Sequence, residues 1–251
     1  MTLKRLDTPH GRVYVRESED GPKFYPSVTT ILSKLPSEYL NNLEKEIGAE
    51  KLKEISEAAA GRGTVMHRFA ENYLICIKNG KEKDKCMLYT QKKTSQEMAS
   101  QFDQKRIEKG RDLFYNLYYE HFEIIHQVIE TEKFLFSDAY GYAGTTDLVY
   151  ENILGSTVVG DFKSANQICG DEKLKKYLYQ VAAYMLAYEE RTGDAVDIGE
   201  VIVSHPMGVQ TVTLSREESA VYKKAFIELA NKYHEEWNIE PILQYYRSIA
   251  S

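Results

Sequence analysis

The chain has 251 residues, of which 43% are hydrophobic and 28% are charged. This composition is typical of a globular protein that can bury a sizeable core, and no apolar run approaches the length that crosses a membrane. The formal net charge of -6 argues mildly against a nucleic-acid partner, because phosphate contacts need positive charge. Net charge alone does not exclude such a partner, since the positive charge is needed only along a single groove.

The cysteines and the N-terminus indicate a compartment. Cys76, Cys86 and Cys169 are too few and too widely spaced for a disulfide framework. The first residues, Met1–Asp7, include Lys, Arg and Asp and lack an apolar core, so we predict neither a signal peptide nor a transit peptide. We therefore expect a reduced, cytoplasmic compartment and no membrane attachment.

The N-terminal residues predict a hairpin and a short helix. The strand-like alternation of side chains over residues 11–15 and a turn signal at residues 19–22 favour a β-hairpin. Ser27 or Thr29 can cap the short helix that follows.

Longer helices are expected in the rest of the first half. Three segments have helical character, and they lie at residues 37–60, 64–77 and 95–121. Gly61-Arg62-Gly63 is expected to separate the first of these helices from the second. Residues 78–93 are polar and charged, and we predict that they are mobile.

The second half of the chain changes to a strand pattern. Five short segments rich in β-branched and aromatic residues are separated by turn signals, and they lie at residues 128–137, 142–150, 157–164, 196–204 and 209–214. The first three are predicted to be consecutive antiparallel strands, and the last two to be a further pair. An amphipathic helix is expected over residues 174–191, and a capping box at Ser215 predicts a last helix to about Trp237.

These elements predict one mixed α/β domain over residues 1–251. Residues 1–126 would supply the hairpin and a helical part, and residues 127–251 the central sheet and its flanking helices. We find no internal repeat and no clean linker.

Two carboxylates and a lysine stand out on neighbouring predicted strands. Asp161 and Lys163 are two residues apart, so they share one face of a strand, and Asp147 lies on the preceding strand. Pairing of these strands around the turn at residues 153–156 would bring the two carboxylates together. Closely spaced carboxylates repel each other, and Mg²⁺ or Mn²⁺ relieves the repulsion by oxygen coordination. The plain alternative is a surface ion pair between Asp161 and Lys163, with Asp147 in a turn.

The motifs taken together resemble a known family. Four segments occur in order: Gly61–His67, Gly141–Asp147, Val159–Ser164 and Gln180–Tyr184. This series resembles the PD-(D/E)XK nuclease superfamily, and more narrowly its RecB-type exonuclease branch. Tyr25–Leu32 is also similar to the opening of the mitochondrial genome maintenance exonucleases and their phage relatives. The resemblance implies a restriction-endonuclease-like core, with a central mixed sheet flanked by helices and an N-terminal helical region.

The resemblance also implies roles for particular residues. His67, Asp147 and Asp161 would be metal ligands, with the carbonyl of Phe162 as a further ligand and Lys163 as the catalytic lysine. Gln180 and Tyr184 lie four residues apart on one helical face, and the family pattern puts them beside the DNA backbone or the lysine.

Five residues are weighed against plainer roles. Glu71 would support the site only indirectly, and a solvated position is the simpler expectation. One of Glu130 and Glu132 is expected to face the site. Tyr177 and Tyr184 would either stack on bases or be core or rim tyrosines.

The expected cofactor is Mg²⁺ or Mn²⁺, because a histidine ligand makes Mn²⁺ a competent activator. Some members of the RecB-type branch hold an iron–sulfur cluster on four cysteines, so three cysteines predict no cluster. The chain also lacks the Gly-x-x-x-x-Gly-Lys-Ser/Thr pattern, so we expect no bound nucleotide.

We therefore predict a metal-dependent DNA exonuclease of recombination, repair or replication, acting on free or single-stranded ends in a bacterial or phage-infected cell. A separate helicase, recombination or single-strand-binding protein would be its partner. The N-terminal helices and residues 78–93 would form an arch over the strand. The alternatives are a structure-specific or sequence-specific endonuclease of the same fold and a non-catalytic nucleic-acid-binding module.

Overall fold

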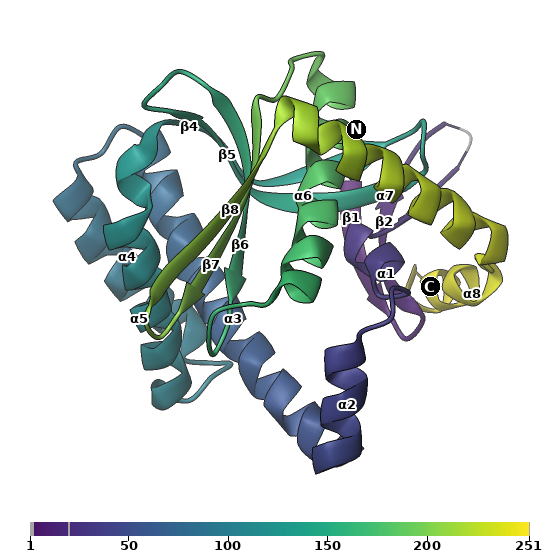
Figure 1. Cartoon of the computed structure of the whole chain (residues 1–251), viewed down its shortest axis with the longest axis horizontal. Helices are drawn as coiled ribbons and strands as arrows, with labels where there is room; N and C mark the ends of the chain where they lie inside the picture. Colours follow the sequence, from purple (N-terminus) through teal and green to yellow (C-terminus); the bar gives the residue numbers. More distant parts are fainter. Residues whose placement is uncertain (1–2, 20, 251) are drawn as a thin grey trace.

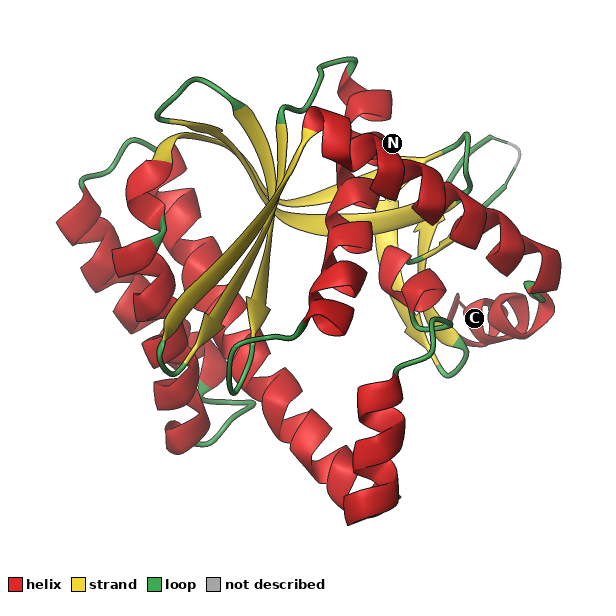
Figure 2. Cartoon of the chain, viewed as in Figure 1, coloured by secondary structure: helices red, strands yellow, loops and turns green. Residues whose placement is uncertain are grey.

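The computed structural model describes residues 3–19 and 21–250, in which two β-sheets are surrounded by helices (Figures 1 and 2). The smaller sheet has three antiparallel strands in chain order, and its members are β1 (Leu3–Thr8), β2 (Gly11–Arg16) and β3 (Lys23–Pro26). The N-terminal hairpin is thereby confirmed. Asp20, in the turn expected at residues 19–22, lies outside the described residues.

The larger sheet has five strands in the order β4-β5-β6-β7-β8. Its members are β4 (Ile125–Ser137), β5 (Tyr142–Asn152), β6 (Thr157–Ser164), β7 (Ile198–His205) and β8 (Gly208–Ser215). All neighbours are antiparallel except β6 and β7, which are parallel. The parallel pair needs a crossover, and α6 (Asp171–Thr192) supplies it. The predicted strands and the mixed sheet are confirmed.

Helices cover both faces of the larger sheet (Figure 1). Successive side chains of β6 point to opposite faces, so this strand contributes apolar residues to both layers. Val158 and Phe162 are buried beneath α3 (Ala49–Lys78) and α5 (Gln104–Glu120). Val159 is buried on the other side, against α6, α7 (Arg216–Glu236) and α1 (Val28–Leu32). The two layers of apolar side chains fix the sheet between the helices, so that the ends of β5 and β6 are held rigidly.

Two helices begin at residues that were predicted to cap them. Ser27 caps α1 by accepting a hydrogen bond from the backbone N–H of Thr30, so Ser27 rather than Thr29 has this role. Ser215 begins α7 with the full capping box, in which Glu218 accepts a bond from the Ser215 backbone. A further C-terminal helix, α8 (Glu240–Ala250), was not expected from the sequence.

The helix boundaries around the glycines differ from the prediction. Gly61-Arg62-Gly63 does not break a helix, because α3 runs through it without interruption. The break lies at Gly48, which has a φ of 82° and separates α2 (Glu38–Ile47) from α3. Gly63 instead permits close packing, since a Cβ atom there would lie 2.9 Å from the Oγ of Ser164 on β6.

The charged segment after α3 is also ordered rather than mobile. Residues 83–98 form α4 (Lys83–Met98), and the helix expected over residues 95–121 is two helices. The second one, α5, begins where Asp103 caps it. Figure 1 shows α4 and α5 beside α3, away from the N-terminal sheet. Within residues 3–19 and 21–250, no helix combines the length and apolar character needed to cross a membrane.

The turn between α3 and α4 explains a cysteine pairing that the sequence did not suggest. Cys76 and Cys86 are joined as a disulfide, with Cα atoms 5.5 Å apart. The expectation of reduced cysteines is wrong for this pair, because the helical hairpin brings two positions ten residues apart side by side. Cys169 is free and buried.

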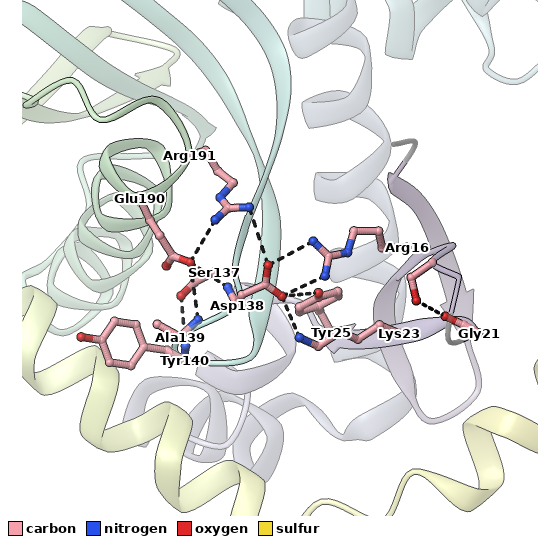
Figure 3. Close-up of polar contacts among 11 residues, drawn as sticks. Arg16, Gly21, Lys23, Tyr25, Ser137, Asp138, Ala139, Tyr140, Glu190 and Arg191 are labelled. Carbon is pink, nitrogen blue, oxygen red and sulfur yellow. Dashed lines mark hydrogen bonds and ion pairs between the residues drawn. The ribbon is translucent and has the colours of Figure 1, made fainter.

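The N-terminal sheet is anchored to the tip of the β4–β5 hairpin (Figure 3). Asp138, in that tip, accepts hydrogen bonds from Arg16, Lys23 and Tyr25 of β2 and β3. Burial raises the pKa of Asp138, but these donors outweigh it and hold the pKa at about 2. Glu190 on α6 accepts the backbone N–H of Asp138 from the other side. The small sheet is therefore fixed against the β4–β5 hairpin, whose second strand carries Asp147.

Candidate active site

Asp147 and Asp161 lie on neighbouring strands where the β5–β6 pairing ends. The antiparallel register ends with Leu148 opposite Gly160, and the two aspartates are the next residues on their strands. The backbone N–H of Phe162 donates to Oδ2 of Asp147 at 2.6 Å. Asp147 and Asp161 both line one cavity, and each is carried by a strand rather than by a loop.

His67 and Glu132 complete a cluster around Asp147. His67 Nδ1 lies 3.3 Å from Oδ1 of Asp147, because α3 packs directly over the β5–β6 pair. One ligand atom from each of His67, Glu132 and Asp147 falls within 4.8 Å of the others. Of the two candidate glutamates, Glu132 thus faces the site, whereas Glu130 pairs with Lys78 and Lys133.

The backbone at Glu132 has an unusual conformation. Its φ is 47°, and it is the one non-glycine residue in the described ranges with a positive φ. A register shift occurs just before it in β4, between Val128 and Glu130. A left-handed residue costs energy, and such strain is found mainly where function requires it. The distorted strand brings the Glu132 carboxylate toward Asp147.

Asp161 is held by a different set of partners. It is 2% exposed, and Lys163 Nζ makes a short contact with its Oδ2. Gln180 donates to Oδ1 of Asp161 at 3.1 Å and to the hydroxyl of Tyr184 at 2.9 Å. Gln180 and Tyr184 therefore do share one face of α6, and Gln180 contacts the carboxylate rather than the lysine. Tyr184 is buried, which fits the core role and not the stacking role.

The electrostatics reflect several charges in a small buried space. Burial raises the pKa of Glu132 to about 8 and that of Asp161 to about 6. Burial would also raise the pKa of Asp147, but His67 and Lys163 outweigh it and the pKa is lowered. For His67, burial lowers the pKa, but the Asp147 carboxylate outweighs it and the pKa is raised.

These groups line an open cavity of about 890 Å³. Glu71 and Tyr177 also line it, and Lys163 Nζ lies 5.2 Å from the centre of the Tyr177 ring. Tyr177 is thus a rim tyrosine with one cation above it. Ser56, Ala59 and Ala60 of α3 contribute to the wall, but among the described residues none of 78–93 does. The arch expected from residues 78–93 is therefore wrong, because α4 packs along α3.

One wall of the cavity was missed by the sequence analysis. Arg5, Arg12 and Tyr14 of the N-terminal sheet and Phe134 of β4 line it. No motif marks these residues. The three from the N-terminal sheet reach the site because that sheet docks on β5, through a 2.9 Å hydrogen bond between Tyr14 and Thr145.

The donor set fits a hard divalent cation. Carboxylate oxygens and one imidazole nitrogen suit Mg²⁺ and Mn²⁺ better than softer metals. Burial, the largest cause, and the Asp147 charge raise the pKa of Glu132, and a bound cation would favour its ionised form. The Phe162 carbonyl leaves β6 at the same edge as its N–H, which points at Asp147.

Comparison with known proteins identifies the family. The model of the PD-(D/E)XK nuclease superfamily matches residues 38–244 of this chain. Two solved structures are similar in part. “SSO0001” is 15% identical, with 68% of this chain and 75% of that chain covered and a TM-score of 0.34. The Eubacterium rectale protein called “Putative exonuclease” is 11% identical, with 83% and 82% covered and a TM-score of 0.44.

These structural scores are too low to carry an argument, and a comparison with curated proteins found no match. The family match spans most of the chain, from α2 to α8, and it includes every residue that the motifs single out from His67 onward. The chain belongs to the PD-(D/E)XK nuclease superfamily.

Proposed function

We propose that this protein is a metal-dependent exonuclease that hydrolyses phosphodiester bonds of DNA from free or single-stranded ends. The observation that carries the proposal is the convergence of Asp147, Asp161 and Lys163 from two paired strands at the floor of an open cavity. The family match supports phosphodiester hydrolysis, and the finer specificity is our inference. Residues 1–251 act as one nuclease domain in this proposal.

His67, Glu132, Asp147 and Asp161, with the Phe162 carbonyl, are the proposed ligands for Mg²⁺ or Mn²⁺. A bound divalent cation neutralises charge on the phosphate and so favours attack by water. Asp161 would share its carboxylate between the cation and Lys163. His67 and Glu132 come from outside the β5–β6 pair and determine how tightly the cation is held.

Lys163 is the proposed catalytic residue. Its ammonium group lies against Asp161 and above Tyr177, so it is already inside the cavity and restrained from both sides. From there it can orient the attacking water and offset the negative charge that develops on the phosphoryl oxygens. Gln180 holds Asp161 in place by its hydrogen bond and is a positioning residue.

The test is digestion of 5′- and 3′-end-labelled DNA, single- and double-stranded, with Mg²⁺, Mn²⁺ or EDTA. We expect metal-dependent release of short products from wild type and none from Lys163→Ala. Circular single-stranded DNA should stay intact. Its cleavage would favour the endonuclease alternative, and unchanged digestion by Lys163→Ala would refute the proposed role of Lys163.

We also propose that the protein acts in the cytoplasm of a bacterial or phage-infected cell, with a separate helicase, recombination or single-strand-binding protein. Fractionation of the cells that produce the protein should recover it in the cytoplasmic fraction. Recovery in a secreted or membrane fraction would contradict the cytoplasmic assignment.

A further inference from the structure

The N-terminal sheet presents a charged face to the active-site cavity. Its two faces differ, because Val13, Val15 and Phe24 on one side are buried beneath α8. On the other side, Arg5 and Arg12 line the cavity. The register pairs Arg5 with Tyr14 and Asp7 with Arg12, so these four side chains lie together on that face.

Asp7 holds the two arginines in position. Arg12 Nε lies 2.8 Å from Oδ1 of Asp7, and Arg5 Nε lies 3.0 Å from Oδ2. The group keeps a net charge of one positive unit, and both guanidinium groups remain substantially exposed. Within the part of the chain that the structure describes, no side chain engages the Nη atoms of Arg12. These donors are free to bind a phosphate in the cavity.

An exposed aromatic ring lies beside this pair. Phe134 is 44% exposed although it belongs to the central sheet, and it lines the same cavity two residues after Glu132. Tyr14 packs against it edge to face, with ring centres 5.8 Å apart, and leaves it open to the solvent. Phe134 therefore offers an exposed aromatic ring to a ligand inside the cavity.

The wall is rigid, because the small sheet is anchored at two points. The Tyr14 hydroxyl makes a hydrogen bond with Thr145, two residues before Asp147. At the tip of the β4–β5 hairpin, Asp138 accepts hydrogen bonds from Arg16, Lys23 and Tyr25 (Figure 3). The arginine pair and Phe134 are thus held at a fixed position relative to the proposed catalytic residues.

We propose that Phe134, Arg5 and Arg12 form a nucleotide-binding subsite for single-stranded DNA, in which a base stacks on Phe134 and a backbone phosphate binds the two guanidinium groups. The proposal rests on the proposed nuclease function and specifies its substrate. Stacking on Phe134 needs a base whose face is free, so the subsite selects an unpaired strand over a duplex. The guanidinium groups would bind the phosphate and the Phe134 ring would bind the base, so the subsite recognises both parts of one nucleotide.

Binding to a fluorescent single-stranded oligonucleotide, measured by anisotropy in EDTA so that no cleavage occurs, tests the subsite. Phe134→Ala should weaken binding by about 5- to 150-fold, as loss of one stacked base does. Phe134→Trp should retain wild-type affinity. Arg12→Gln should lower the slope of log affinity against log salt by about 0.7, the value for one phosphate contact on a single strand. Duplex affinity should change little in Phe134→Ala.

Two matched variants serve as controls. Tyr119→Ala removes an aromatic side chain that is 69% exposed outside the cavity, and Arg216→Gln removes an arginine paired with one aspartate. Neither should alter affinity or salt slope. Equal binding by Phe134→Ala and wild type, or an equal loss with Tyr119→Ala, would overturn the subsite. If wild type digests DNA with metal but Phe134→Ala binds normally, the subsite alone fails. If wild type binds the strand but no metal supports digestion, the proposed function fails instead.

Discussion

Glu132 offers the sharpest test of how the site is built. Its carboxylate lies in a buried cluster with Asp147, on a residue whose backbone is left-handed. Replacing it by Gln keeps the size of the side chain and removes the ionisable group. We expect Glu132→Gln to stabilise the metal-free protein and to remove most of the stabilisation that a divalent cation brings to wild type.

The magnitude follows from the pKa of this carboxyl. Burial, the largest cause, and the Asp147 charge raise the pKa of Glu132 from its ordinary value of 4.5 to about 8. At pH 7 the unfolded chain ionises this group, whereas the folded chain keeps it protonated, which costs about 3 kcal/mol of stability.

The sign of the pH dependence is fixed by the same reasoning. A raised pKa in the folded state means that the folded chain binds more protons than the unfolded one between pH 4.5 and 8. The free energy of unfolding of wild type should therefore fall as the pH rises through this window. Asp161, whose pKa is raised to about 6, adds to the fall in both proteins. The advantage of Glu132→Gln should grow from near zero at pH 4.5 to about 3 kcal/mol at pH 7.

The assay is urea unfolding of both proteins in EDTA from pH 4.5 to 8, repeated at pH 7 with Mn²⁺. Added Mn²⁺ at about a hundred times its Kd should stabilise wild type by about 2.7 kcal/mol. Glu130→Gln is the matched control. It lies on the same strand, but its partners are Lys78 and Lys133 near the surface, so its loss should cost at most about 1 kcal/mol. Equal stability of wild type and Glu132→Gln at pH 7 in EDTA would refute this account of the site.

Three further predictions follow from other contacts. Lys163→Met should slow single-turnover cleavage by about 10²- to 10⁴-fold while calorimetric Mn²⁺ binding persists, and loss of Mn²⁺ binding would contradict its separate role. Gly110→Ala should cost about 1–3 kcal/mol in denaturant unfolding, because its Cβ would lie 2.5 Å from the Val65 Cβ and 3.0 Å from the Arg62 carbonyl oxygen. This clash should outweigh the higher helix propensity of alanine, and unchanged stability would contradict it. Phe226→Ala, in the core, should cost about 3–5 kcal/mol, whereas Val221→Ala, on the same helix and 70% exposed, should stay within about 0.5 kcal/mol of wild type.

Local patterns were sufficient for much of the fold. The strands around Asp147 and Asp161 follow from alternation and turn residues, and the capping box at Ser215 marks a helix start because its two hydrogen bonds are made within one turn. The antiparallel pairing of the two strands that carry these aspartates also follows, since a short turn fixes their register. These features depend on residues close together in the sequence.

Helix continuity and cysteine pairing depended on distant contacts. Gly63 was taken for a helix break because glycine has a low helix propensity, but here it makes room for Ser164 on a strand about a hundred residues later. The same holds for Cys76 and Cys86, which meet only because α4 folds back along α3. Helix propensity predicts such positions only weakly, and tertiary packing overrides it.

The sequence by itself determined the family and the order of the motif residues His67, Asp147, Asp161 and Lys163, because each motif lies in a short segment that can be recognised without the fold. Only the tertiary structure selected Glu132 over Glu130, through a distorted strand that no local pattern marks. It also brought the N-terminal sheet, with Arg5 and Arg12, to the same cavity. Nothing in a strand's own sequence specifies which surface it will pack against, and that packing decides which side chains reach the site.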